Sequence, residues 1–479
     1  MDRTDATGTL IKPGKSSQKT SLSSAVLEAA LDRSDTSPKT GLRNLPAELL
    51  QEISRWVASG SAGDTAAGLH ALMLSNRFLN ASVLNGKSIK EHYLFLQPLI
   101  GAFKALKPHL PIHEINSQML ALMGPKQRQE QVTAVLGLAD ERQKSEAIAR
   151  LGAGLAALEP RQREALITAA LNLDDDYKAE AIAGLGAGLA ALDRSQQEAL
   201  ITAALGLDDE EHKAEAIAGL GDGLAALDQS QQEALITAAL NLDDDDYKAE
   251  AIAGLGAGLA ALDQSQQEAL ITAALNLDDD DYKAEAIAGL GAGLAALERT
   301  QQQALVTATL NLADDWHKAW AIAGLGAGLT ALERSQQQAL ATAALNLADD
   351  SHKAEAIAGL GAGLTALERT QQQALVTAAL GQIDEGAKAR ALAGLGAGLA
   401  ALKPPLQQAL VTAALDLASV GYKALAIAGL SAGLAALEPS QQQALVKATL
   451  GLADDGYKAL VIAGLVNGYQ ASRVRDYLR

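Results

Sequence analysis

The groups in this sequence with the clearest potential for chemistry are runs of aspartate that recur along the chain. Four consecutive aspartates occupy 243–246 and four more occupy 278–281. Calcium-binding loops also gather carboxylates, but they alternate their ligands and require a central glycine, and these runs have neither feature. Each run precedes a segment of helical periodicity, where acidic oxygens accept hydrogen bonds from free backbone N–H groups. We therefore interpret the runs as helix caps on a solvated rim and predict no metal site.

A repeated glycine pattern is the second candidate. Gly254, Gly256 and Gly258 have the spacing of a dinucleotide-binding fingerprint, which requires a preceding strand and occurs once per domain. Here the pattern recurs with no strand pattern before it, in steps of 35 residues after a first step of 34, beginning at Leu151, Leu185, Leu220, Leu255, Leu290, Leu325, Leu360, Leu395, Leu430 and Leu465. We predict no cofactor. We place the glycines inside a helix, where close approach of neighbouring helices offsets a cost of about 1 kcal/mol per glycine.

Other catalytic groups are sparse. The absence of cysteine excludes disulfides, thiolate zinc sites and thiol nucleophiles. The seven histidines are scattered, and His212, His317 and His352 occupy the same repeat position. An enzyme would interrupt the repeat with a cluster of catalytic side chains facing one pocket, and the sequence has no such cluster. We predict that the protein is not an enzyme, and a repeat-fold lyase is the weakest alternative.

The repeat itself predicts the fold, because a fixed period of this length is typical of a solenoid. In the unit at 243–277, large apolar residues form a stripe on one helical face: Ile252, Leu255, Leu259 and Leu262. Ser265 and Glu268 then match a capping box that begins a second helix. Pro160 and Pro439 occupy this turn in two other units, where a first-turn N–H lacks a partner. The prediction is an all-α solenoid of about nine two-helix units.

The remaining chain is divided by composition. We predict a disordered leader at 1–40, a small helical domain at 41–82, a helical linker at 83–113, and repeats with a C-terminal cap at 114–479. The units resemble the HEAT and armadillo class of α-solenoid. Hydrophobic residues make up 48% of the chain and aromatic residues 3%, so Ala, Leu, Ile and Gly must form the core. The net charge of −18 argues against nucleic acid as a partner, and the lack of a long apolar run argues against a membrane.

Two repeat positions carry different residues in different units. The variable column is Glu180, Glu215, Glu250, Glu285, Trp320, Glu355, Arg390, Leu425 and Leu460. The aromatic column is Tyr177, His212, Tyr247, Tyr282, His317, His352, Ala387, Tyr422 and Tyr457. Such columns form continuous rows on a solenoid surface and can recognise a partner, although drift at exposed positions would also produce variation. We predict that Trp316, Trp320 and Arg390 bind a target protein.

The segment before the repeats resembles an F-box. Leu45, Pro46, Leu49 and Ile53, with Glu48, match the family's opening, and Leu74-Ser75-Asn76-Arg77-Phe78 is similar to its close. The resemblance implies that Leu45, Pro46, Leu49, Ile53, Leu72 and Phe78 dock on the Skp-type adaptor of an SCF-type cullin-RING ubiquitin ligase. The alternative is a helical cap that shields the first repeat.

The leader, rich in Ser, Thr and Lys, resembles the export signal of a bacterial type III secreted effector. Together the resemblances imply a substrate-recruiting adaptor that acts in the cytoplasm or nucleus of a eukaryotic host cell, with the repeats holding the target. A cytoplasmic α-solenoid scaffold with no ubiquitin role is the alternative function. The lack of cysteine is compatible with an adaptor, since it removes the thiols that ligases and RING domains need.

Overall fold

The computed structural model describes residues 98–478, with side chains to 466. The chain divides into two compact units, 1–94 and 95–479, and all described residues belong to the second. The predicted F-box-like segment at 41–82 and the leader at 1–40 therefore lie outside the described residues. Every element between 98 and 478 is helical. Among these helices, none combines the length and apolar character needed to cross a bilayer.

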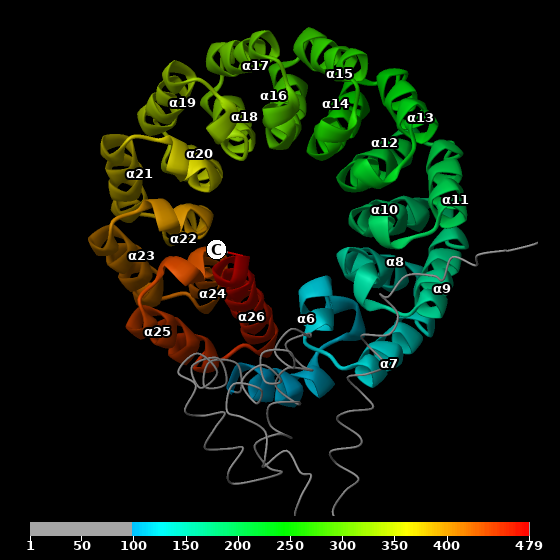
Figure 1. The fold of residues 1–479 in the computed structure, drawn as a ribbon, viewed down its shortest axis with the longest axis horizontal. Helices are drawn as coiled ribbons and strands as arrows, with labels where there is room; N and C mark the ends of the chain where they lie inside the picture. Colours follow the sequence, from blue (N-terminus) through cyan, green and yellow to red (C-terminus); the bar gives the residue numbers. More distant parts are fainter. Residues whose placement is uncertain (1–97, 479) are drawn as a thin grey trace, which may run out of the picture. The chain divides into compact units, whose positions relative to one another are not determined.

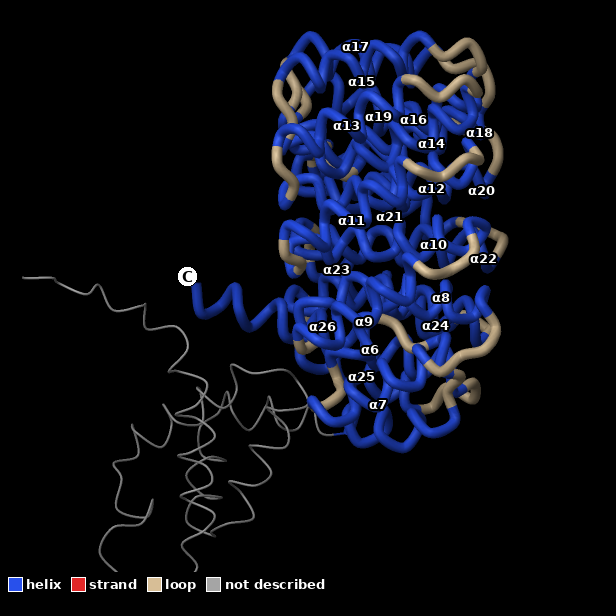
Figure 2. The backbone as a smooth tube through the Cα atoms, turned by 90° about the vertical axis from the view of Figure 1, so that its right-hand side faces the viewer, coloured by secondary structure: helices blue, strands red, loops and turns tan. Residues whose placement is uncertain are grey.

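The described residues form a two-layered α-solenoid (Figure 1). Among the described residues there are ten inner helices, all of which except α24 begin at an acidic residue: α8 (Glu141–Leu151), α10 (Asp175–Leu185), α12 (Glu210–Leu220), α14 (Asp245–Leu255), α16 (Asp280–Leu290), α18 (Asp315–Gly326), α20 (Asp350–Leu360), α22 (Glu385–Leu395), α24 (Val420–Leu430) and α26 (Asp455–Leu478). Ten outer helices, again among the described residues, alternate with them: α7 (Pro125–Leu136), α9 (Pro160–Leu171), α11 (Arg194–Leu205), α13 (Gln229–Leu240), α15 (Gln264–Asn276), α17 (Arg299–Asn311), α19 (Arg334–Asn346), α21 (Arg369–Gly381), α23 (Pro404–Asp416) and α25 (Pro439–Leu450). Most connecting loops lie at two edges of the array (Figure 2).

Each inner helix from α8 to α24 ends within the glycine pattern, whereas the last one, α26, continues through it. The inner helix α14 stops at Leu255, and a 3₁₀ helix, η7 (Gly256–Ala261), follows. The prediction of one helix through all three glycines is therefore wrong, because Gly256 and Gly258 lie in the tighter 3₁₀ segment. The buried Gln267 side chain donates from Nε2 to the carbonyls of Leu259 and Leu262, at 2.9 and 3.1 Å. The bond to Leu262 satisfies a carbonyl that the end of the 3₁₀ helix leaves free, and the bond to Leu259 adds to the one that its carbonyl accepts from the Leu262 N–H.

Corresponding 3₁₀ helices occur in the other units, and a short helical segment precedes the first one. They are η4 (Gly152–Ala157), η5 (Gly186–Ala191), η6 (Gly221–Ala226), η8 (Gly291–Ala296), η9 (Leu329–Ala331), η10 (Gly361–Ala366), η11 (Gly396–Ala401) and η12 (Ser431–Ala436). Residues 98–106 are helical, followed by η2 (Lys107–His109), η3 (Ile112–Glu114) and α6 (Ser117–Ala121). The break is therefore a property of the repeat.

Side-chain caps mark the start of most helices in the repeats, although α10, α23 and α24 begin without one. The outer helix α15 begins after Asp263, whose carboxylate accepts from the Gln266 backbone N–H at 3.0 Å while Gln266 Oε1 accepts from the Asp263 N–H. This capping box corrects the predicted pair Ser265 and Glu268, which lies two residues downstream. At the inner helices, the prediction that the aspartate runs act as caps is confirmed, since Asp244 Oδ1 accepts from the Asp246 N–H at 2.9 Å.

The glycines allow inner helices to pack backbone against backbone. A methyl group on Gly254 would overlap the backbone of Ala218 in α12, and one on Gly256 would overlap the carbonyl of Gly289 in α16. Ile252 and Leu255, on the side of α14 that faces the outer layer, are 0% exposed, as are their counterparts in the neighbouring units. The prediction that the glycines allow close packing is confirmed. Neighbouring helices are therefore closer together in the inner layer than in the outer layer.

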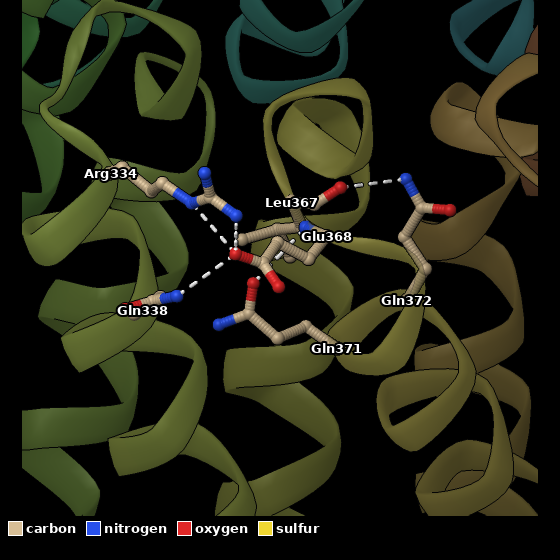
Figure 3. Close-up of polar contacts among 6 residues, drawn as sticks. All are labelled: Arg334, Gln338, Leu367, Glu368, Gln371 and Gln372. Atoms are coloured by element: carbon tan, nitrogen blue, oxygen red, sulfur yellow. Dashed lines mark hydrogen bonds and ion pairs between the residues drawn. The ribbon is translucent and has the colours of Figure 1, made fainter.

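The outer layer is joined by longer polar side chains. Arg334 of α19 donates from Nε to Oε1 of Glu368, the N-cap residue of α21, at 2.7 Å, and Gln338 donates to the same oxygen at 3.1 Å (Figure 3). Equivalent ion pairs join Arg299 to Glu333 and Arg194 to Asp228. Such exposed pairs each contribute about 0–1 kcal/mol, so they align neighbouring units more than they stabilise them.

The difference in spacing between layers curves the array until its ends meet. Inner helices surround the centre, and outer helices cover them on the outside (Figure 1). The last inner helix, α26, contacts α6 at the beginning of the described array. At this junction a methyl group on Gly456 would lie 3.7 Å from Oε2 of Glu114. The described unit is therefore a closed ring of helix pairs.

Candidate binding surface on the inner helices

One face of each inner helix is left uncovered by the outer layer. In α14, Asp246 and Glu250 lie one helical turn apart on the face opposite the buried Ile252 and Leu255. Asp246 is exposed and Glu250 is half-buried. Since the outer helices cover the opposite side, this face is directed toward the centre of the ring (Figure 1).

The variable column therefore has a partner column four residues upstream on the same inward face. The upstream column is Arg142, Asp176, Glu211, Asp246, Asp281, Trp316, Ser351, Gly386, Gly421 and Gly456. The downstream column is Glu146 followed by the variable column already defined. The two columns together form what we term the inner surface. The sequence analysis did not include the upstream column, although the helical i, i+4 relation to the variable column would have identified it.

Four consecutive units make one part of the inner surface acidic. We term this part the acidic arc, and it consists of Asp176, Glu180, Glu211, Glu215, Asp246, Glu250, Asp281 and Glu285. Burial, together with the carboxylates of Glu215 and Asp246, raises the pKa of Glu250 to about 7. Burial likewise raises the pKa of Glu285 to about 7, with Glu250 adding to the shift.

Three glutamates of the acidic arc have no ion-pair partner among the described residues. Within the described part of the chain, none of the ion pairs includes Glu215, Glu250 or Glu285. The adjacent carboxylates repel one another, and this repulsion adds to the effect of burial in raising the pKa values of Glu215, Glu250 and Glu285. A positively charged group placed against the arc would relieve this repulsion.

The two tryptophans adjoin the acidic arc on α18. The rings of Trp316 and Trp320 have centroids 5.3 Å apart at an interplanar angle of 45°, which confirms that they lie one turn apart on one face. Trp316 is 44% exposed. His317 lies beside Trp316, with ring centroids 5.0 Å apart, and its Nε2 is 3.5 Å from Oδ1 of Asp281 in the preceding unit. The aromatic pair and the acidic arc are therefore contiguous.

Arg390, the third predicted target-binding residue, lies two units beyond Trp320 and is already engaged. Its Nε is 3.3 Å from Oε2 of Glu355, so the pair joins α20 to α22. Both side chains remain largely exposed to solvent, and such a pair contributes about 0–1 kcal/mol. The structure thus brings Trp316 and Trp320 together but places Arg390 in a separate contact.

The last two inner helices carry an apolar patch that the sequence analysis did not select. Tyr422 and Leu425 of α24 are 44% and 46% exposed, and Tyr457 and Leu460 of α26 are 47% and 40% exposed. We term these four residues the apolar patch. The Tyr457 ring lies over Gly421, where a methyl group would be 3.3 Å from its hydroxyl oxygen. Glycine in the upstream column thus makes room for the tyrosine of the next unit.

Other features of the described residues repeat and therefore do not define a site. One hollow is lined by Leu205, Glu210, Lys213 and Ser230, and a second is lined by their counterparts one unit earlier, Leu171, Asp175, Lys178 and Ser195. In the residues that the structure describes, no three His, Asp or Glu side chains are arranged to hold a metal ion. The predicted adaptor-binding residues Leu45, Pro46, Leu49, Ile53, Leu72 and Phe78 lie outside the described residues.

No protein-family model matches the chain, and no curated protein is similar to it. Among solved structures, the chain is similar to Kap121p bound to Nup53p, at 10% identity over 93% of this chain and 51% of that one, with a TM-score of 0.36. It is also similar to Kap121p bound to the extreme C-terminus of the phosphatase Cdc14p (11% identity, 95% and 53% covered, TM-score 0.35) and to She4p (12%, 94% and 81%, TM-score 0.22). The chain spans about half the length of the Kap121p chains.

Proposed function

We propose that the helical ring is a noncatalytic protein-interaction scaffold whose partner binds the inner surface. The observation that supports this function is the coordinated change of the two inner columns. Both are acidic in four units, both are tryptophan in the next, and the last two units pair glycine with leucine. The other three units are mixed and pair Arg142 with Glu146, Ser351 with Glu355 and Gly386 with Arg390. Independent drift at exposed positions would not change both columns together. Exposed tryptophan, tyrosine and leucine side chains in contiguous groups are typical of interfaces.

The experiment compares proteins captured from a cell extract by three forms of the full chain. These are the wild type, an inner-surface variant with Trp316→Ala and Trp320→Ala, and an outer control with Gln373→Ala, since Gln373 is exposed on α21. We expect at least one protein that the wild type and the control both capture and the tryptophan variant loses. Capture of the same proteins by all three forms would overturn the proposed function.

A second candidate function is recruitment to a ubiquitin ligase, with the ring holding the target. The sequence motif of Leu45, Pro46, Leu49 and Ile53 supports it, through its resemblance to an F-box. Leu45, Leu49 and Ile53 would each contribute about 1.5–3 kcal/mol if their side chains were buried on the adaptor. A pull-down with a Skp-type adaptor tests this candidate. Binding that Leu45→Ala with Pro46→Ala abolishes would support it, and no binding by the intact chain would exclude it.

A further inference from the structure

We propose that the ring binds a single amphipathic helix of its partner, with lysine and arginine on one side and apolar residues on the other. This proposal rests on the scaffold function and names the chemical class of the partner. It follows from three properties of the inner surface: the space that it encloses, the charge of one side and the apolar character of the other.

The size of the ring limits what can occupy its centre. Eleven elements, α6 and the ten described inner helices, follow one another around the closed array. With neighbouring helices about 8 Å apart, their axes form a circle of about 14 Å radius, which leaves an opening about 18 Å wide inside the helix surfaces. One α-helix is about 10–12 Å wide with its side chains, whereas a small domain is about 30 Å across. The opening therefore suits one helix and excludes a folded domain.

The space inside the ring is open to solvent. Trp316, Tyr422, Leu425, Tyr457 and Leu460, all on inner helices, are between 40% and 47% exposed. Large apolar side chains on an inward face would be covered if other side chains of the ring filled the centre. Their exposure shows that the described part of the chain leaves this surface free.

The acidic arc determines the charge of the occupant on one side. Its carboxylates repel one another across α12, α14 and α16, and lysine or arginine would neutralise this repulsion. Trp316 and Trp320 adjoin the arc, and exposed tryptophan rings attract cations over their faces. An acidic occupant would add to the repulsion, so the electrostatic complement is a basic segment.

The apolar patch determines the opposite side of the occupant. The helices α24 and α26, which carry the patch, lie across the centre of the ring from α12 and α14 (Figure 1). A helix in the opening would therefore face the acidic arc on one side and the apolar patch on the other. A uniformly basic segment would leave Leu425 and Leu460 facing charges, and a uniformly apolar one would bury the carboxylates without partners. Only an amphipathic segment complements both sides.

The test measures binding of model peptides to the full chain by fluorescence anisotropy. The probe is a labelled peptide of about 20 residues, long enough to span about 30 Å as a helix, with lysine on one face and leucine on the other. Two control peptides are used: the same residues reordered so that both faces are mixed, and the original order with glutamate in place of lysine. We expect the facially segregated lysine peptide to bind at least tenfold more tightly than either control. Equal binding of the segregated and reordered peptides would overturn the proposal.

Matched variants locate the binding. Leu425→Glu with Leu460→Glu alters the patch at exposed positions, and Glu250→Gln with Glu285→Gln alters the arc. We expect each pair to weaken the segregated peptide at least tenfold, while Gln373→Glu on the outer layer changes it less than twofold. Circular dichroism confirms that each variant is folded. Tight binding that neither inner pair weakens would contradict the proposal.

The peptide and extract experiments distinguish failure of the amphipathic-helix proposal from failure of the scaffold function. If the tryptophan variant loses a captured protein but the segregated peptide does not bind, the amphipathic-helix proposal fails while the scaffold function stands. If the wild type and the tryptophan variant capture the same proteins, the scaffold function fails.

Discussion

The packing of the inner layer predicts that Gly254→Ala destabilises the protein, although alanine is the better helix former. Gly254 lies within α14, where helix propensity alone favours alanine by about 1 kcal/mol. Its added methyl group would overlap the α-carbon, β-carbon and carbonyl oxygen of Ala218, none of which can rotate away. Overpacking of this kind costs about 1–3 kcal/mol, and we take the upper end because a whole helix must shift. The net expectation is a loss of about 2 kcal/mol.

A matched control separates packing from propensity. Gly381, the last residue of α21, has no atom within 4 Å of an added methyl group, so Gly381→Ala should leave stability unchanged or raise it by up to about 1 kcal/mol. Urea unfolding followed by circular dichroism measures both variants, and hydrogen exchange shows whether the loss is confined to units next to α14. A Gly254→Ala protein as stable as the wild type would refute close backbone packing as the reason for the glycines.

Two further predictions concern polar groups. The pKa values of Glu250 and Glu285 are raised to about 7, above the value in the unfolded chain. Between about pH 4.5 and pH 7 the folded protein therefore binds more protons than the unfolded chain does, and the free energy of unfolding should fall as the pH rises through this range. The expected loss is about 1–2 kcal/mol per group after solvent screening. Thermal melts from pH 5 to pH 8 should show this slope, and Glu250→Gln with Glu285→Gln should flatten it; an unchanged slope would contradict the assignment. Gln372→Ala removes the side-chain donor of the Leu367 carbonyl and one of two donors to the Leu364 carbonyl, which keeps the Leu367 N–H, and should cost about 1–3 kcal/mol in urea unfolding. The neighbouring exposed Gln373→Ala should cost less than about 0.5 kcal/mol, and equal effects would contradict this role.

The sequence contains enough to predict the units but not their junctions. The period, the two helices per unit and the aspartate caps follow from local patterns that each unit carries in full. The break after Leu255 does not, because the apolar stripe continues through Leu259 and Leu262 in the 3₁₀ segment. Two overlapping capping patterns begin at Asp263 and Ser265. The helix begins after Asp263, because the backbone is already extended at Leu262.

The inner surface shows the same limit. Trp316 and Trp320 were identifiable from their rarity and helical spacing. The apolar patch was not, because Leu425 and Leu460 are ordinary residues whose exposure depends on which helical face the outer layer covers. Ring closure depends on the difference between inner and outer helix spacing, and a small change in that difference would leave the array open. The total curvature is the sum of this difference over all the units, and the sequence of one repeat does not determine it.

Site-specific photocrosslinking most directly tests the claim that a partner binds at the centre of the ring. A benzoylphenylalanine probe replaces Trp320 or Leu425 on the inner surface, or Gln373 on the outer layer, in otherwise intact protein. The account predicts that both inner probes crosslink the same partner, through a segment that mass spectrometry identifies as basic and amphipathic, and that the outer probe does not. Crosslinks to the partner from position 373 alone would contradict it.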